Sequence, residues 1–251
     1  MRYGGNTSCV EVRPPDGSLI VLDAGTGIRS LGLALAGTPV HEVDLLLTHM
    51  HLDHIEGLGF FTPLFDPDCT LRIWGPSPNG TTLRQHIATY LSPPYFPVPF
   101  EQIPARITFN EVWDDAWELD GLRIATTPVS HPGRTVGYRI SQNGTSIAFI
   151  PDNEPALDHE SGLAVAADVD LLFHDAQYTD AEYRTRVGWG HTSLADLTNY
   201  LAAAAPRRAL MFHHDPAHTD EQLEQMLDDA RRGFDSGELS LAHEGLEIEL
   251  P

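Results

Sequence analysis

The sequence has only two cysteines, no long apolar run and no recognisable secretion signal. Cys9 and Cys69 are too few for a disulfide scaffold, and neither belongs to a Cys-x-x-Cys pair. No stretch approaches the run of about 18 apolar residues that a membrane-spanning helix requires. Residues 1–6 lack the apolar region of a signal peptide. We therefore expect a cytoplasmic protein with reduced thiols and no membrane partner.

Basic residues are also scarce. The 251 residues include 15 basic and 36 acidic side chains, which gives a formal net charge of −21. The arginines gather only in short pairs, at 184/186, 207/208 and 231/232. A protein that binds long nucleic acids usually carries a basic surface, although metal ions can reverse the field at a site. The charge favours a small-molecule substrate over a long nucleic acid, and a role in solubility alone explains it equally well.

Metal-binding residue types are concentrated in one segment, residues 48–54, which reads Thr-His-Met-His-Leu-Asp-His. The segment directly follows the apolar run 43–47, which is too short for a helix and is typical of a buried strand. Imidazole and carboxylate groups bind zinc, iron and manganese. Four potential ligands are too many for one catalytic ion that must keep an open position, so we expect two ions. These ligands are His49, His51, Asp53 and His54. The alternative is a polar loop whose histidines are merely solvated.

Three more potential ligands stand at the ends of other apolar runs. They are His131 after residues 122–127, Asp152 after residues 145–150 and His213 after residues 209–212. Open α/β sheets place their chemistry at the carboxyl ends of strands. Each residue alone could be an ordinary loop residue. Together with the segment 48–54, they indicate a metal centre.

Short apolar runs alternate with amphipathic segments throughout the chain, which predicts a layered α/β fold with helices outside sheets. Hairpin turns are indicated at 14–17 and at Asn143-Gly144. The further expected strands are 71–75, 106–112, 122–127, 136–140, 145–150, 169–173, 209–212 and 246–250. The expected helices are 28–36, 81–91, 193–205 and 219–234, with a helix-like segment beginning at 55–58. Because no linker separates independent parts, we expect residues 1–251 to form a single domain.

The order and spacing of the seven potential ligands resemble the metallo-β-lactamase superfamily, over most of the chain from residue 3 to about residue 220. The resemblance implies an αββα sandwich with a dinuclear metal site at one edge of its facing sheets. It also implies how the ligands divide. His49, His51 and His131 would hold the first ion, Asp53, His54 and His213 the second, and Asp152 would bridge both.

Four segments, 2–9, 22–27, 174–176 and 190–193, resemble the tRNase Z and cyclic-nucleotide phosphodiesterase branch of this superfamily. In that branch a histidine paired with a carboxylate assists phosphodiester cleavage. His191 and Asp175 hold the matching positions, although His191 could instead be a loop residue before a helix.

The chain departs from this branch in two ways. tRNase Z enzymes often carry an arm that grips tRNA between the ligands matching His131 and Asp152. Here residue 152 comes only 21 positions after residue 131, and the interval reads as a hairpin, so no such arm fits there. Relatives also usually begin with a strand and a glycine-containing loop before the segment matching residues 2–9, and this sequence starts without them.

We therefore expect a metal-dependent hydrolase, and most of all a phosphodiesterase acting on small phosphodiesters such as cyclic nucleotides. Asp53 would orient the attacking water, and His191, held by Asp175, would stabilise the developing charge or protonate the leaving group. Residues 92–100, with four prolines and three aromatics, would be a loop over the substrate pocket or else a stiff linker. Zinc is the expected metal, with manganese or iron as alternatives. The oligomeric state stays open between a monomer and a homodimer, although dimers are common among relatives.

Other readings stay open. A tRNase Z-like ribonuclease would use the same residues on RNA. Lactones, thioesters or β-lactams could be hydrolysed on the same ions, since metal ions also polarise carbonyls. A metal-binding protein without catalysis is the remaining alternative.

Overall fold

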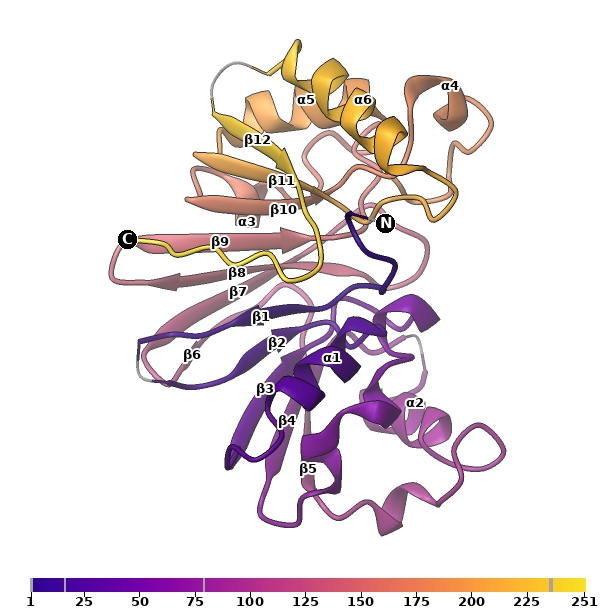
Figure 1. The fold of residues 1–251 in the computed structure, drawn as a ribbon, viewed down its shortest axis with the longest axis vertical. Helices are drawn as coiled ribbons and strands as arrows, with labels where there is room; N and C mark the ends of the chain where they lie inside the picture. Colours follow the sequence, from indigo (N-terminus) through magenta and orange to yellow (C-terminus); the bar gives the residue numbers. More distant parts are fainter. Residues whose placement is uncertain (1, 16, 79, 235–236) are drawn as a thin grey trace. The chain divides into compact units, whose positions relative to one another are not determined.

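The computed structural model describes residues 2–15, 17–78, 80–234 and 237–251 (Figure 1). The chain divides into two compact units. We call residues 6–112 the N-terminal unit, and residues 1–5 with residues 113–251 the C-terminal unit. Each unit contains one β-sheet and its own helices.

The N-terminal unit is built on a five-stranded sheet of order β1-β2-β3-β4-β5. β1 and β2 pair antiparallel, and the other neighbours pair parallel. The strands are β1 (Val10–Val12), β2 (Ile20–Leu22), β3 (Glu42–Leu46), β4 (Thr70–Gly75) and β5 (Arg106–Glu111). The helices are α1 (Gly27–Ala34) and α2 (Leu83–Tyr90), with 3-10 turns η1 (Leu52–His54), η2 (Leu58–Phe60), η3 (Thr62–Phe65) and η4 (Phe100–Gln102).

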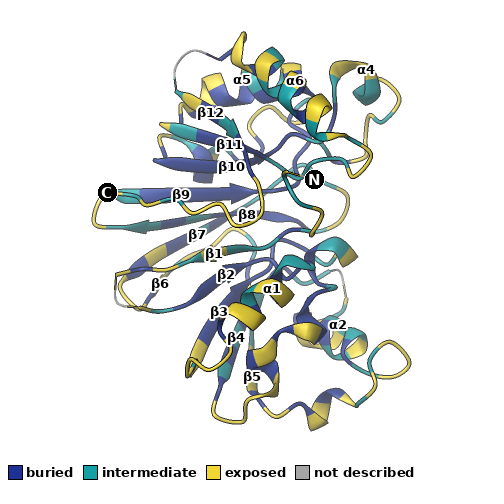
Figure 2. Ribbon diagram, viewed as in Figure 1, coloured by how far each residue is buried: buried dark blue, intermediate teal, exposed yellow. Residues whose placement is uncertain are grey.

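The core of the N-terminal unit lies between this sheet and its two helices (Figure 2). Val21, Leu45 and Ile73, from three neighbouring strands, are buried in one cluster with Ile28 of α1 and Ile87 of α2. β3 lies between two parallel neighbours, and four of its five residues are buried. Three of these buried residues are apolar, and the fourth, Asp44, accepts two hydrogen bonds from Arg72 of β4. The segment that follows β3 therefore starts from a rigid base.

The C-terminal unit is built on a seven-stranded sheet of order β12-β11-β10-β9-β8-β7-β6. β6 to β9 pair antiparallel, and β9 to β12 pair parallel. The strands are β6 (Ala116–Leu119), β7 (Leu122–Pro128), β8 (Val136–Gln142), β9 (Thr145–Ile150), β10 (Leu171–Asp175), β11 (Arg208–Phe212) and β12 (Glu238–Leu241). The helices are α3 (Leu163–Ala166), α4 (Asp180–Tyr183), α5 (Leu194–Ala204) and α6 (Asp220–Arg231).

The core of the C-terminal unit joins the parallel strands to α5 and α6. Ala148, Leu172 and Met211, from β9, β10 and β11, are buried in one cluster with Leu201 of α5 and Met226 of α6. The carboxyl ends of these three neighbouring parallel strands lie at one edge of the sheet. Functional residues placed directly after these strands are thus neighbours within this unit.

Most of the expected elements are confirmed, with ends shifted by a few residues. The hairpin turn at Asn143-Gly144 is present, and both residues have positive φ, of 52° and 90°, as a type I′ turn needs. β1 and β2 form the first expected hairpin, although Asp16 of its turn lies outside the described residues. In the described part of the chain, no helix combines the length and the apolar character needed to cross a membrane.

Two expectations are wrong. Residues 246–250 are not a strand, and the edge strand is β12, at 238–241. Residues 55–58 do not begin a regular helix, because the chain forms the separate turns η1, η2 and η3. Gly57 and Pro63 interrupt this region, and a Cβ at Gly57 would lie only 2.0 Å from the carbonyl oxygen of Gly25. β6, α3 and α4 were not expected.

The proline- and aromatic-rich segment 92–100 belongs to the N-terminal unit. The Phe96 ring lies against Gly59 and stacks on Phe65, with ring centroids 6.4 Å apart. Phe100 is buried, whereas Tyr95 is 73% exposed. The segment is therefore a loop packed on its own unit rather than a linker between the units.

Candidate metal centre

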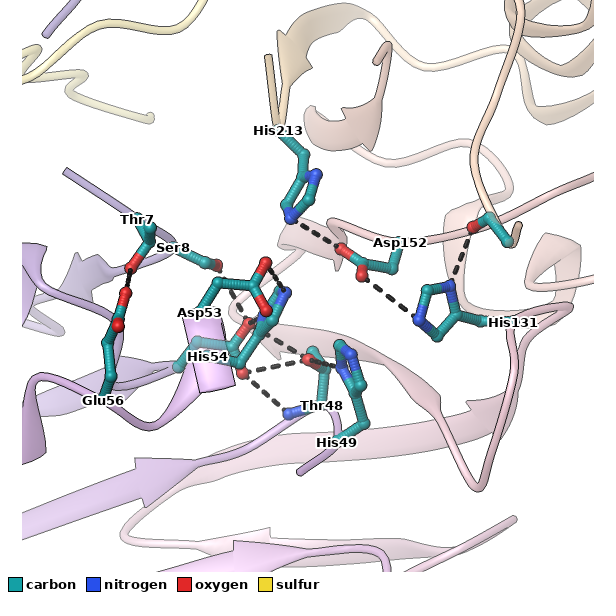
Figure 3. Close-up of polar contacts among 12 residues, drawn as sticks. Thr7, Ser8, Thr48, His49, Asp53, His54, Glu56, His131, Asp152 and His213 are labelled. Carbon is teal, nitrogen blue, oxygen red and sulfur yellow. Dashed lines mark hydrogen bonds and ion pairs between the residues drawn. The ribbon is translucent and has the colours of Figure 1, made fainter. Parts of the chain in front are cut away.

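The N-terminal unit gathers the four predicted ligands of the segment 48–54 immediately after β3. Figure 3 shows three of them, His49, Asp53 and His54. His49 and His54 are buried, and their ring centroids lie 4.2 Å apart. The ring of His51 lies edge-on to that of His49, with centroids 4.4 Å apart. Asp53 is more accessible: its side chain is 40% exposed, and its Oδ2 lies 3.3 Å from His54 Nε2.

The buried carboxylate of Asp23 orients the imidazole of His54 in this cluster. Asp23, fully buried, accepts a hydrogen bond from His54 Nδ1 at 2.7 Å. It also accepts the backbone N–H and the hydroxyl of Thr48 and the hydroxyl of Ser8. Because Nδ1 of His54 carries the proton, its Nε2 keeps the lone pair that a metal ion requires. Asp23 therefore sets the tautomer and the direction of a predicted ligand.

The glycine-rich loop 23–27 lies directly against the segment that carries Asp53. A Cβ at Gly25 would lie 2.3 Å from the carbonyl oxygen of Asp53 and 2.4 Å from the hydroxyl of Thr7. Only glycine allows this approach. The loop thus brings Asp23 up to the imidazole of His54, and its glycines serve close packing rather than phosphate binding.

The C-terminal unit gathers the other three predicted ligands at the carboxyl ends of its strands (Figure 3). Asp152 follows β9, and its side chain is 2% exposed. Its Oδ2 lies 3.4 Å from His131 Nε2, and its Oδ1 lies 3.3 Å from His213 Nε2. Both histidines thus direct their Nε2 atoms at the carboxylate of Asp152.

A main-chain carbonyl fixes the ring of His131. Nδ1 of His131 donates to the carbonyl oxygen of Gly190 at 2.8 Å, which leaves the lone pair on Nε2. Gly190 has a φ of +92°, and a Cβ there would lie 2.2 Å from His131 Nδ1. Both the backbone conformation and the close contact require glycine at this position.

The predicted pair of His191 and Asp175 is present in the same unit. Nδ1 of His191 donates to Asp175 Oδ2 at 2.7 Å, and the buried carboxylate also accepts the backbone N–H groups of Asn153, Gln177 and Thr192. Burial opposes protonation of His191, but the attraction and hydrogen bond of Asp175 outweigh it, so the pKa of His191 is raised. The His191 ring stacks on that of His213, with centroids 5.1 Å apart.

Each unit thus holds a compact cluster of groups that bind divalent metals. The first comprises His49, His51, Asp53 and His54, and the second comprises His131, Asp152 and His213, with the His191 ring stacked on His213. One ligand atom each from Asp152, His191 and His213 lie within 4.8 Å of one another. Imidazole nitrogens beside carboxylate oxygens suit zinc, manganese or iron. The donor chemistry of both clusters fits such ions.

Sequence reasoning missed Asp23. Its signal was available, because Asp23 follows the buried strand β2 just as the predicted ligands follow theirs.

Comparison with known proteins agrees with this arrangement. Residues 19–214 match the model of the beta-lactamase superfamily domain. A ribonuclease Z of Mycobacterium sp. (strain KMS) is 28% identical over 172 residues, which cover 64% of this chain and 59% of that relative. The aligned part therefore spans less than two thirds of the relative's own length.

Solved structures share the fold. The metallo-beta-lactamase fold protein YhfI from Bacillus subtilis has a TM-score of 0.72 at 18% identity, covering 99% of this chain and 96% of that one. A diphosphatase of the PhnP family has a TM-score of 0.69 at 21% identity, covering 98% and 85%. The metallo-β-lactamase fold expected from the sequence is confirmed, and this chain belongs to the metallo-β-lactamase superfamily.

Proposed function

We propose that this chain is a metal-dependent phosphodiesterase that acts on small phosphodiesters. Its superfamily, a relative described as ribonuclease Z and a neighbour described as a PhnP-family diphosphatase all support hydrolysis of phosphate esters. The observation that carries the proposal is the bond between His191 and Asp175, next to His213. His191 belongs to neither of the ligand sets that the superfamily implies, so its oriented imidazole is available for proton transfer.

The proposed centre holds two divalent ions, with zinc favoured over manganese and iron. His49, His51 and His131 would hold one ion, Asp53, His54 and His213 the other, and Asp152 would contact both. This assignment rests on the order of the ligands in the sequence and on the superfamily. Bound ions would supply Lewis acidity to the phosphoryl group and lower the pKa of water.

Two side chains of the protein would then transfer the protons. Asp53 would orient the attacking water and accept its proton. Attack at phosphorus breaks the bond to one ester oxygen, and protonated His191 would donate its Nε2 proton to that leaving oxygen. The products are a phosphomonoester and an alcohol, so atoms and protons balance. Asp175 would keep the His191 ring aimed and stabilise its positive charge.

Cleavage of RNA is the second candidate, because relatives of this chain are named ribonuclease Z. Two observations favour small substrates instead. The net charge is −21, and the interval between His131 and Asp152 contains only the β8–β9 hairpin and its flanking loops. Carbonyl substrates such as lactones are a third candidate on the same residues.

The test is metal analysis of the purified protein combined with hydrolysis of bis-p-nitrophenyl phosphate before and after chelation. Matched phosphotriester and acyl esters, and a precursor tRNA, serve as competing substrates. We expect two ions per chain and a chelator-sensitive preference for the phosphodiester. Preference for the acyl ester would move the function to carbonyl substrates, and cleavage of the precursor tRNA alone would favour the ribonuclease. Absence of bound metal after reconstitution would refute the proposal.

His191→Ala separates catalysis from metal binding. We expect phosphodiester turnover to fall by about 100-fold or more, the size of a general-acid contribution, while metal content is unchanged. Normal turnover in this variant would exclude the role of His191.

A further inference from the structure

One buried carboxylate of the C-terminal unit lies outside the proposed ligand and proton-transfer groups. Glu154, two residues after Asp152, is 1% exposed. Its Oε1 accepts the backbone N–H of Gly188 and the hydroxyl of Tyr183, each at 2.7 Å. Its Oε2 accepts the backbone N–H of Gly190, also at 2.7 Å. Three donors to one carboxylate satisfy the buried charge, and hydrogen bonds to a charged acceptor are stronger than neutral ones.

The loop that Glu154 holds also has local contacts: the Trp189 N–H donates to the carbonyl oxygen of Arg186 at 3.0 Å, and the Arg186 guanidinium lies over the Trp189 ring. Val187 and Trp189 of this loop are 56% and 60% exposed, and Gly188 and Gly190 both have positive φ. Glycines and exposed apolar side chains give a segment little intrinsic rigidity. The two anchored N–H groups flank Trp189 and end directly before His191.

The same contacts lead to the candidate metal centre. Gly190 donates its N–H to Glu154 and accepts the Nδ1–H of His131 on its carbonyl oxygen. The backbone N–H of Glu154 donates to the carbonyl oxygen of Ser130, the residue before His131, at 2.7 Å. Glu154 thus ties together the three segments that carry His131, Asp152 and His191.

We propose that Glu154 is a positioning residue of this centre. Its carboxylate fixes the peptide of Gly190, and that peptide fixes the tautomer and direction of His131 and the start of the turn to His191. The consequence for metal binding rests on the proposed function. The consequence for loop order does not.

The test compares Glu154→Gln with Tyr183→Phe. A glutamine keeps the shape but offers one acceptor oxygen, so its NH₂ must face the N–H of either Gly188 or Gly190 and lose that bond. The phenylalanine removes only the phenol and leaves both glycine contacts. Amide hydrogen exchange over residues 184–191 and zinc affinity by competition with a chelating dye are measured on both variants and on the unaltered protein.

We expect Glu154→Gln to speed exchange in 184–191 by about 10-fold and to weaken zinc binding by about 10- to 100-fold, the range for groups that orient metal ligands. Tyr183→Phe should stay within about twofold in both measurements. Equal losses in the two variants, or faster exchange of the Gly190 amide with unchanged zinc affinity in Glu154→Gln, would overturn the positioning role.

The unaltered protein gives an independent measurement if the variant does not fold. The amides of Gly188 and Gly190 should exchange slowly although their neighbours Val187 and Trp189 are exposed. Fast exchange of these two amides would refute the anchoring. A protein that binds no zinc would refute the proposed function, while the exchange data would still test Glu154.

Discussion

Three histidines beside or within the two clusters are oriented in the same way, by a hydrogen bond from Nδ1. His54, His131 and His191 each donate Nδ1–H to a fixed acceptor, which is Asp23, the carbonyl oxygen of Gly190 and Asp175 respectively. An imidazole held in this way has one tautomer, and its Nε2 is available for a ligand or a proton. Hydrogen-bond acceptors at the Nδ1 side of these rings thus orient the imidazoles in both clusters before any ion binds.

Asp23→Asn tests this orientation of an imidazole in the N-terminal unit. Oδ2 of Asp23 accepts from both His54 Nδ1 and the Ser8 hydroxyl, whereas an amide NH₂ at that position would oppose the Nδ1–H of His54. We expect zinc affinity to fall by about 10- to 100-fold and the free energy of unfolding to fall by about 1–3 kcal/mol. Competition titration and urea unfolding measure the two effects.

Ser8→Ala is the matched control for Asp23→Asn, because it removes one neutral donor from the same carboxylate and leaves the His54 bond in place. Its zinc affinity should equal that of the unaltered protein. If Ser8→Ala weakens zinc binding as much as Asp23→Asn does, then the general packing of Asp23 matters rather than the tautomer of His54.

At the scale of elements, α4 is only four residues long and is held by side-chain contacts. Glu182 accepts a hydrogen bond from His218 Nε2 at 3.0 Å and another from the Thr179 hydroxyl. Burial would raise the pKa of Glu182, but these hydrogen bonds outweigh it and lower the pKa from 4.5 to about 2. This contact therefore connects α4 with the loop before α6.

The lowered pKa makes this contact depend on pH. A carboxyl group whose pKa is lower in the folded state stabilises the fold fully above its ordinary pKa, and the effect is lost as the pH falls towards the folded value. We expect Glu182→Gln to lower the free energy of unfolding by on the order of 1–2 kcal/mol at pH 6, allowing for solvent screening. The difference should shrink between pH 4.5 and pH 2. Urea unfolding at pH 6, 4 and 3 measures it, and a difference that grows on acidification would contradict the assignment.

The capping box of α6 offers a second element-scale prediction. The Thr219 hydroxyl accepts the N–H of Gln222, and the Gln222 side chain accepts the N–H of Thr219. Thr219→Ala should lower the free energy of unfolding by about 1 kcal/mol. Gln222→Ala removes only the reciprocal bond and should cost less. Thermal unfolding of both variants checks the order, and a larger loss in Gln222→Ala would contradict it.

Elements were predictable where local signals and packing agree. The helix expected at 219–234 and the Asn143-Gly144 turn depend on local signals, and both are confirmed, the helix as α6 with a capping box at Thr219. The strand expected at 246–250 failed, because alternating apolar and acidic residues show which face could be buried but not where a pairing edge is free. β11 takes β12, at 238–241, as its partner instead. Glu154 and Asp23 were missed for a related reason, since their roles come from contacts with residues far along the chain.

At the scale of the whole molecule, acidic residues outnumber basic ones, and several arginines lie beside carboxylates. Three of the arginines singled out in the sequence pair with carboxylates in the described structure: Arg207 with Asp170, Arg208 with Glu238 and Arg232 with Asp229. Arg186 lies over the rings of Tyr178 and Trp189. Because carboxylates and aromatic rings contact these arginines, less basic surface is available to a phosphate backbone. The net charge of −21 adds long-range repulsion.

This charge distribution makes a testable distinction between the two leading functions. Fluorescence anisotropy with labelled tRNA should show no saturable binding up to on the order of 10 µM protein at physiological salt, because few counterions would be released on contact. A small phosphodiester such as a cyclic nucleotide carries little charge, so turnover of bis-p-nitrophenyl phosphate should change little with salt. tRNA binding that weakens steeply as salt is raised would instead show that a basic surface exists and would favour the ribonuclease. His191→Ala protein is the appropriate sample for the tRNA measurement, since its lowered turnover slows cleavage of the probe while the acidic excess of the chain is kept.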